Sequence, residues 1–223
     1  MAVYKTNFDG NPFIGLYARA SDELTLIPKS SPDKFATRAQ EVLGGRIFRA
    51  SVASSPYLGV YFAINSNGIV SSPFMHKEEL AEIKKLGLNV LVINEGGFSA
   101  VGNNICCNDN GAIVNEEMPP EIVKQIADVL GVEAVRMPLA GYKTVGMMAA
   151  ATNKGWIAHN RINEKEAAAL ESIFKVKGMN ATLNAGTAMV GLAVVANSKA
   201  ALVGETTTGF ETGRAEQALE LTD

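Results

Sequence analysis

Two adjacent cysteines are the first candidates for chemistry in this chain of 223 residues. Cys106 and Cys107 end an apolar run and precede the turn 108–111. A cysteine nucleophile needs a histidine to take its proton and a third group to orient that histidine. His76 precedes a predicted helix, whereas His159 follows a predicted strand. The two histidines therefore do not occupy equivalent positions, and neither is placed beside the cysteines by the sequence. We therefore interpret the cysteines as small buried residues, His76 as a solvated first-turn residue and His159 as a surface or rim residue.

Other chemical motifs are missing from the sequence. There is no phosphate-binding glycine loop, no paired-histidine metal helix and no G-x-S-x-G, and Gly96-Gly97 precedes no clear helix. Adjacent cysteines favour neither a disulfide nor a metal site, so we expect no metal and no cofactor. A net charge of −3 argues against binding nucleic acid mainly through its phosphates but permits a protein partner, including a basic one.

The elements that carry these residues repeat five times. Glycines recur at intervals of 44, 43, 44 and 45 residues, namely Gly15, Gly59, Gly102, Gly146 and Gly191. Eleven residues after them come Leu26, Val70, Ile113, Ile157 and Leu202, and about 28 after come Leu43, Leu86, Leu130, Phe174 and Leu219. A period of this length indicates one supersecondary unit in five copies.

Each copy predicts the same order of elements. Runs such as 59–64 and 190–195 predict a buried strand, and the asparagine-rich turns 65–68, 108–111 and 153–155 predict hairpins closed by residues with positive φ. A return strand, a helix and a last strand follow. Pro32, Pro119 and the pair Asn163/Glu166 mark helix starts, and Gly44, Gly87 and Gly131 mark helix ends.

The two ends of the chain complement each other. The fifth copy stops after its helix and lacks a last strand, whereas residues 2–5 stand at the offset of a last strand from Gly15. An open array would need polar capping copies, and neither end copy is more polar than the others. We therefore predict a closed five-bladed α/β ring, with residues 1–223 forming one domain.

Two polar features have alternative explanations. Lys5, Arg49 and Arg136 share one position in three copies, so they would lie on a circle around one end or around the central opening. They either hydrogen-bond between blades or collect an anionic or carbonyl-rich partner. Asn103 is the one polar residue at the position after the repeated glycine, and it either contacts a partner or marks a bulge or an internal hydrogen bond.

Composition indicates a soluble protein. The chain is 47% hydrophobic, but no apolar stretch approaches 18 residues and the N-terminus has no signal-peptide pattern. We expect a cytoplasmic protein without membrane contact.

The sequence resembles the translation initiation factor 6 family, the ribosome anti-association factors of archaea and eukaryotes. The resemblance covers the whole chain and is carried by the strings 1–3 with 14–15, 102–103, 107–109, 127–133, 144–146 and 206–208 with Glu211. It implies the pentein fold, a five-bladed pseudo-symmetric ring, which agrees with the ring inferred from the repeats.

The resemblance also implies a function. It predicts a monomeric, non-catalytic factor that binds the intersubunit side of the large ribosomal subunit and blocks the small subunit, with a role in large-subunit maturation. The expected partners are a large-subunit ribosomal protein, near its C-terminus, and the neighbouring sarcin–ricin loop of the rRNA. The family pattern carries Asn65 and Asn103 over as ribosome-binding residues, and proximity adds Asn104 and Asn108. The sequence stops at Asp223, without the tail of eukaryotic members, which favours an archaeal source.

An enzymatic alternative shares the implied fold. Guanidine-modifying enzymes such as arginine deiminases and amidinotransferases have the same ring, so fold alone does not decide function. Their catalytic cysteine lies late in the chain, whereas residues 179–223 contain no cysteine. We therefore disfavour this alternative.

Overall fold

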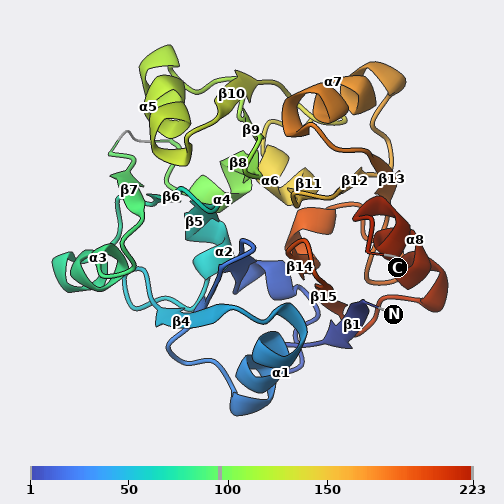
Figure 1. Ribbon diagram of the computed structural model, residues 1–223, viewed down its shortest axis with the longest axis horizontal. Coiled ribbons are helices and arrows are strands. Elements are labelled where there is room, and N and C mark those ends of the chain that lie inside the picture. The colour runs from blue at the N-terminus through green and yellow to red at the C-terminus, as the bar shows by residue number, and fades with distance from the viewer. Residues whose placement is uncertain (1, 95–96, 222–223) are drawn as a thin grey trace.

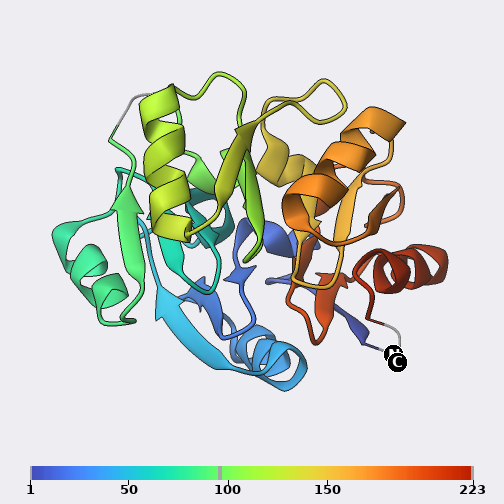
Figure 2. The same ribbon diagram turned by 45° about the horizontal axis from the view of Figure 1, so that its top comes forward.

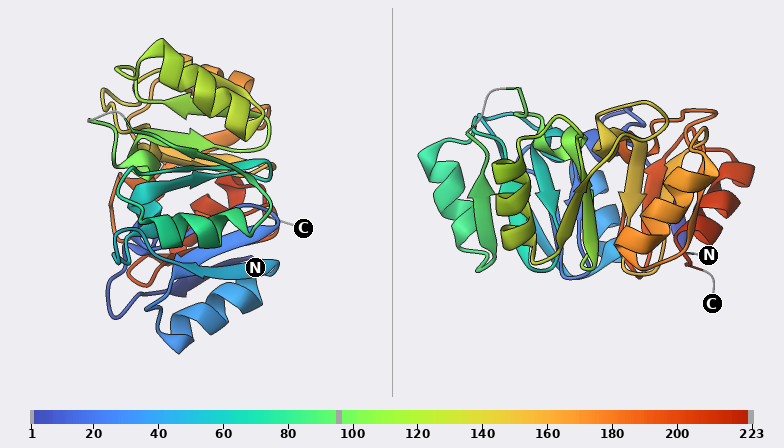
Figure 3. Two further views of the ribbon diagram at one scale, coloured as in Figure 1. Left: turned by 90° about the vertical axis from the view of Figure 1, so that its left-hand side faces the viewer. Right: turned by 90° about the horizontal axis from the view of Figure 1, so that it is seen from above.

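The computed structural model describes residues 2–94 and 97–221. Met1, Gly96 and residues 222–223, which entered the sequence interpretation, lie outside the described residues. Within the described part, five three-stranded sheets and eight α-helices surround a central axis (Figure 1). Seen from the side, the molecule is thinner along this axis than across it (Figure 3).

Each of the five units consists of a short helical turn, an inner strand, a central strand, an outer helix and an outer strand. The short turns are η1 (Ile14–Leu16), α2 (Leu58–Tyr61), α4 (Val101–Asn104), α6 (Val145–Met148) and η2 (Val190–Leu192). The inner strands are β2 (Arg19–Ala20), β5 (Phe62–Ile64), β8 (Ile105–Cys107), β11 (Ala149–Ala151) and β14 (Val194–Ala196). The central strands are β3 (Leu24–Pro28), β6 (Gly68–Ser71), β9 (Gly111–Val114), β12 (Trp156–His159) and β15 (Ala201–Gly204).

The outer elements complete the units. The helices are α1 (Asp33–Leu43), α3 (Lys77–Lys84), α5 (Pro120–Leu130), α7 (Glu164–Phe174) and α8 (Gly209–Ala218). The outer strands are β4 (Arg46–Ala50), β7 (Asn89–Val92), β10 (Glu133–Arg136), β13 (Gly178–Ala181) and β1 (Val3–Thr6). The predicted helix starts are confirmed, because Pro32 and Pro119 precede α1 and α5, and Asn163 and Glu166 form a capping box on α7.

Strand direction gives the molecule two different faces. In every sheet the inner and central strands are antiparallel, and the central and outer strands are parallel. One end of each sheet therefore carries the inner-to-central hairpin and the end of the outer helix; we call this the hairpin face. The opposite end carries the start of the outer helix and the short helical turn; we call it the helix-start face.

The core follows the repeated aliphatic positions. The five aliphatic residues that follow the repeated glycines by eleven positions lie on the central strands. All are fully buried: Leu26, Val70, Ile113, Ile157 and Leu202. Of the second aliphatic set, only Leu86 keeps partial exposure. The outer helices cover these strands from the circumference (Figure 1), so each unit buries its apolar stripe against its own sheet and a neighbour's.

The repeated glycines lie in the short helical turns and not in strands, so the prediction of one continuous strand over 59–64 or 190–195 is wrong for its first half. The reason is packing at the axis. A Cβ atom on any of the five glycines would stand within 3.0 Å of the preceding unit's glycine carbonyl oxygen, closer than real Cβ atoms come. A strand would present side chains there, whereas a helical turn with glycine lets the backbones touch.

These contacts run once around the axis. Gly59 packs on Gly15, Gly102 on Gly59, Gly146 on Gly102, Gly191 on Gly146 and Gly15 on Gly191. The inner strands of neighbouring units contact one another in the same order. The first and last units are thus as close to each other as any other pair of neighbours.

The N-terminal strand belongs to the last unit. β1 pairs parallel with β15, from Val3 opposite Ala201 to Thr6 opposite Gly204. Figure 2 shows the blue strand β1 beside the red strands of the fifth unit. The predicted origin of the missing strand is confirmed, and this pairing covers what would otherwise be an open sheet edge.

The axial glycine packing makes a prediction about stability. We expect Gly102→Ala to lower the free energy of unfolding by about 3 kcal/mol, because the added methyl group must displace the backbone of Gly59 and Phe62 in the preceding unit. Gly213→Ala is the matched control, since Gly213 lies in α8 with nothing within 4 Å of the added Cβ and should gain up to about 1 kcal/mol of helix propensity. Urea unfolding of both variants measures the difference, and equal stability of the two would contradict the packing argument.

Candidate functional site

The predicted cysteine chemistry has no support from the surroundings of the thiols. Cys106 and Cys107 lie on β8 and line a cavity on the axis, whose lining contains neither histidine. Burial raises the pKa of the Cys106 thiol to about 12, although the nearby Arg19 guanidinium acts in the opposite direction. Burial also raises the pKa of Cys107. Both groups therefore stay protonated near neutral pH, where a nucleophile would need the thiolate.

The two histidines lie outside the lining of the cavity that the cysteines share. His76 directly precedes α3 and is exposed, as expected. His159 is buried at the end of β12, so its predicted surface position is wrong. Its Nδ1 accepts a hydrogen bond of 3.1 Å from the Arg161 backbone N–H, and its ring lies 5.4 Å from that of Tyr142. Burial, with the Arg161 charge, lowers the pKa of His159, which indicates a neutral imidazole that caps a turn.

The residue that occupies the centre is Arg19, on inner strand β2. Its guanidinium donates to the backbone carbonyl oxygens of Phe62, Gly102 and Gly191, at 3.4, 3.0 and 3.3 Å. Burial lowers its pKa from the usual value for arginine. The sequence interpretation missed Arg19, although one signal was present: the corresponding residues of the other units are Ala63, Cys106, Ala150 and Val195, none of them charged.

The cations Lys5, Arg49 and Arg136 lie on outer strands, so of the two predicted places the central opening is wrong, whereas a circle toward one end is compatible with their positions near the ends of these strands. Arg49 donates to the carbonyl oxygens of Lys29 and Ser31, and Arg136 donates to that of Met118. These bonds join an outer strand to the segment before the helix of the same unit, not to another unit. Equivalent positions do lie on a circle, but this circle follows the circumference.

Asn65 and Asn108 hold the hairpin face together. In each, Oδ1 accepts from the backbone N–H groups two and three residues later. The Nδ2 of Asn65 donates to the carbonyl oxygens of Asn108 and Leu130, and that of Asn108 donates to those of Thr152 and Phe174. Each side chain thus binds the next unit's hairpin and the end of its helix, and both are buried. Their contact with a ribosome stays a prediction.

The hairpins close by these side-chain bonds and not by the predicted positive φ. In turns 65–68, 108–111 and 153–155 no described residue has positive φ. In the first two turns the asparagine side chain replaces a backbone acceptor, a geometry known as an Asx turn, and in the third the Thr152 hydroxyl accepts from the N–H groups of Lys154 and Gly155. A second set of bonds, one residue further on, links Ser66 to Asp109, Asp109 to Asn153, and Asn153 and Ser198 to Asp22.

Asn103 has a different environment on the opposite face. It is half-buried in the helical turn α4, and its Oδ1 is enclosed without a hydrogen-bond partner. The turn is regular, so of the predicted explanations neither a bulge nor an internal bond to Oδ1 describes it. Its neighbour Asn104 is buried, donates to the Ala100 carbonyl oxygen and accepts from Asn115. Asn103 is therefore the one predicted site residue with an unused acceptor.

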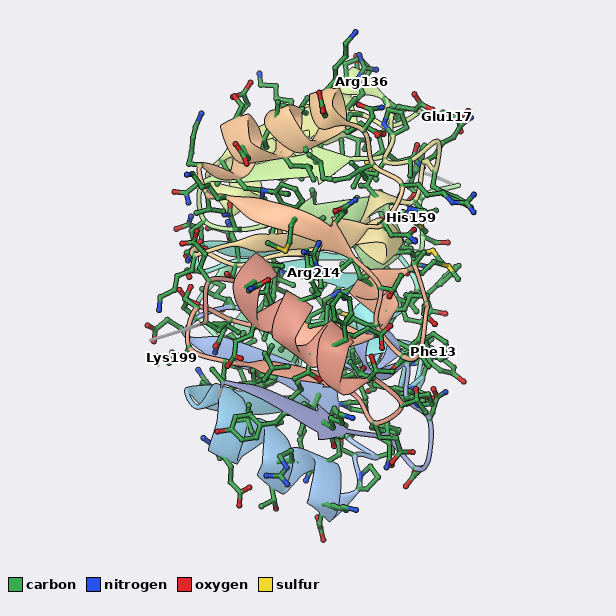
Figure 4. All side chains as sticks on the ribbon, turned by 90° about the vertical axis from the view of Figure 1, so that its right-hand side faces the viewer. Phe13, Glu117, Arg136, His159, Lys199 and Arg214 are labelled. Atoms are coloured by element: carbon green, nitrogen blue, oxygen red, sulfur yellow. The ribbon has the colours of Figure 1, made fainter. Side chains whose placement is uncertain are left out.

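The helix-start face also carries most of the exposed large apolar side chains. Tyr57 and Met189 directly precede short helical turns, Tyr142 lies three residues before α6, Phe74 precedes α3, and Phe210 lies in the first turn of α8 with 79% of its surface exposed. Figure 4 shows the two faces edge-on, with Lys199 at the hairpin face and Phe13 and Glu117 at the helix-start face. Exposed apolar residues gathered on one side of a protein are typical of interaction surfaces.

Buried and half-buried carboxylates brace the turns of this face. Ala53, Ser54, Ala140 and Ala185 all have positive φ, which is unfavourable for residues with a side chain. Backbone N–H groups of these residues donate to Glu79, Glu166 and Glu211, the third residues of α3, α7 and α8. The bracing fixes the outline of the helix-start face.

Protonation of Glu79 and Glu211 is strongly disfavoured. Burial alone would raise the pKa of Glu211, but hydrogen bonds from the N–H groups of Thr208 and Gly186 and from two threonine hydroxyls lower it to about 2. Glu79 also has a pKa near 2, because hydrogen bonds from the Ser51 hydroxyl and three backbone N–H groups outweigh its burial.

The described residues offer no candidate for a metal site or for a membrane-spanning helix. There, no three side chains of His, Cys, Asp or Glu are grouped so that they could hold a metal ion. No helix of the described part is long and apolar enough to cross a bilayer.

Comparison with known proteins places this fold and site in context. The eIF-6 family model matches residues 3–218. The chain belongs to the eIF-6 family. The match covers all five units, so the axial glycines, Arg19 and the helix-start face all lie within the family region.

Individual relatives agree. Proteins named Translation initiation factor 6 from Picrophilus torridus and Thermoplasma acidophilum are 36% and 34% identical to it, each over 97% of this chain and 99% of the relative. The protein of that name from Thermococcus onnurineus is 33% identical over the full length of both chains. The chain is thus similar to archaeal translation factors throughout its length.

The bracing carboxylates predict a pH-dependent stability. We expect Glu211→Gln to lower the free energy of unfolding by about 2 kcal/mol at pH 7, because the amide cannot accept all the N–H groups that the carboxylate does. The folded pKa is depressed, so this contribution is present above the unfolded pKa of about 4.5 and disappears as the pH falls toward 2.

The control for this experiment is Glu171→Gln, an exposed residue of α7, which should change stability little. Chemical unfolding at several pH values measures both variants. A deficit of Glu211→Gln that persists unchanged at pH 2 would contradict the assignment of the effect to the ionised carboxylate.

Proposed function

We propose that this protein binds the large ribosomal subunit and sterically prevents the small subunit from joining it, with a further role in large-subunit biogenesis. Membership of the eIF-6 family supports a translation factor. The observation that carries the docking part of the proposal is the helix-start face, which combines exposed apolar residues with the half-buried Asn103.

The proposed mechanism is steric and needs no catalytic residue. We infer that the five units form the closed pentein ring, that residues 1–223 make one domain, and that the factor acts as a monomer in the cytoplasm. The glycine contacts around the axis and the pairing of β1 with β15 support this inference. A rigid ring keeps its binding face in one shape, so little conformational entropy is lost on docking.

The chemistry of the helix-start face favours a protein as the main partner. Its exposed large apolar side chains are mostly aromatic, and the net charge of the chain is −3. Binding dominated by phosphates would call for clustered lysine and arginine. We therefore propose that a large-subunit ribosomal protein, near its C-terminus, meets this face and that the sarcin–ricin loop of the rRNA lies beside it.

The four predicted asparagines have different roles in this proposal. Asn103 is the half-buried one of the four and contacts the subunit directly. Asn65, Asn104 and Asn108 are buried and internally bonded, so they act on binding through the shape of the ring.

The first test is binding to isolated subunits. We expect the purified protein to co-sediment with large subunits in a gradient and to reduce the formation of joined ribosomes when both subunits are mixed. Small subunits alone are the control and should leave the protein at the top of the gradient. Co-sedimentation with small subunits only would refute the proposal.

The second test concerns Asn103. Asn103→Ser should weaken binding to the large subunit by roughly tenfold, since the shorter side chain loses its contact with the partner. Its melting temperature should change little, because Oδ1 has no internal partner. Lys199→Ser, on the hairpin face, is the control and should bind like the unaltered protein (Figure 4). If Asn103→Ser loses stability in proportion to binding, the residue is structural and the assigned contact is wrong.

A further inference from the structure

The cation at the centre of the ring has an unusual set of partners. The guanidinium of Arg19 reaches carbonyl oxygens from three other units, on Phe62, Gly102 and Gly191. Among the ion pairs of the described residues, none joins Arg19 to a carboxylate. The dipoles of backbone carbonyl groups therefore provide most of the stabilisation of this charge.

The space around the guanidinium has a matching shape. The axial cavity measures about 50 Å³ and is lined mainly by small residues, among them Ala20, Ala63, Ala149 and Ala150. Arg19 is the one charged residue of its lining. Because the glycine turns bring backbone oxygens to the axis without side chains, a flat cation with several donors can bond to more than one unit at once.

We propose that the axis of the ring is a guanidinium-binding site that this chain fills with its own Arg19 side chain. The acceptors lie 3.0–3.4 Å from the guanidinium nitrogens and belong to separate units, an arrangement that suits a planar fork of N–H donors. In the unaltered protein the site is closed to free guanidinium compounds. Without the Arg19 side chain, the same oxygens are left facing a cavity that a small guanidinium ion fits.

This proposal does not depend on the proposed ribosomal function, and its test uses stability alone. Arg19→Ala is refolded and melted with methylguanidinium chloride at about 20 mM, a concentration far below denaturing ones. Urea at the same concentration is the control for a flat molecule without charge. Sodium chloride at that concentration is the control for ionic strength. Arg49→Ala is the matched variant, since Arg49 also donates to two carbonyl oxygens but lies on an exposed outer strand.

The expected result is specific to one variant and one ligand. Arg19→Ala melts at a lower temperature than the unaltered protein, and methylguanidinium raises its melting temperature by roughly 2–4 °C in a saturable way. Urea and sodium chloride do not, and neither the unaltered protein nor Arg49→Ala gains from methylguanidinium. If Arg19→Ala does not fold, Arg19→Met takes its place. If that variant also fails, the refolding yield of Arg19→Ala in methylguanidinium chloride is compared with its yield in sodium chloride, and the higher yield is expected with methylguanidinium.

Two results overturn the proposal. One is a response of Arg19→Ala to methylguanidinium no larger than that of Arg49→Ala. The other is an equal response to urea, which would show that filling the cavity matters and the charge does not.

Discussion

The close approach of five backbone turns at the axis is the constraint on which the rest of the structure depends. It requires the absence of a side chain at Gly15, Gly59, Gly102, Gly146 and Gly191, each of which packs on the carbonyl group of its neighbour. This close approach requires a helical turn before each inner strand. It also directs backbone carbonyl oxygens toward the axis and fixes the position of each inner strand along that axis. Arg19 then donates hydrogen bonds to two of those oxygens, on Gly102 and Gly191.

The two faces follow from this centre in different ways. On the hairpin face, asparagine side chains bind the next unit's turn and helix end, so that neighbouring units are fastened to one another. On the helix-start face, carboxylates such as Glu79 and Glu211 brace turns whose backbone is strained. The first arrangement uses up its polar groups internally, whereas the second leaves aromatic side chains and Asn103 available. The proposed docking function uses that difference.

Much of the architecture was predictable from the sequence, because periodicity and turn chemistry are local signals. The repeated glycines gave five units, and the offset of residues 2–5 correctly assigned β1 to the last sheet. The helical turns were missed because their composition is that of a buried strand, and only packing between units decides the conformation. The roles of Arg19 and of the bracing glutamates could not be predicted, because they depend on contacts between residues distant in sequence. The burial of His159 could not be predicted either, because it depends on how deep the end of its strand lies. For Asn65 and Asn108 the sequence pattern identified important residues but could not separate contact with a partner from contact within the ring.

The central claim is that a rigid five-unit ring presents its helix-start face to the large ribosomal subunit. An electron-microscopy map of the protein bound to isolated large subunits tests it most directly. The account predicts a five-unit disc on the intersubunit side, with the turns around Tyr57, Asn103 and Tyr142 against the subunit and the hairpins around Asn110 and Lys199 facing away. A disc seated by its hairpin face, or bound on the side of the subunit away from the small subunit, would contradict it.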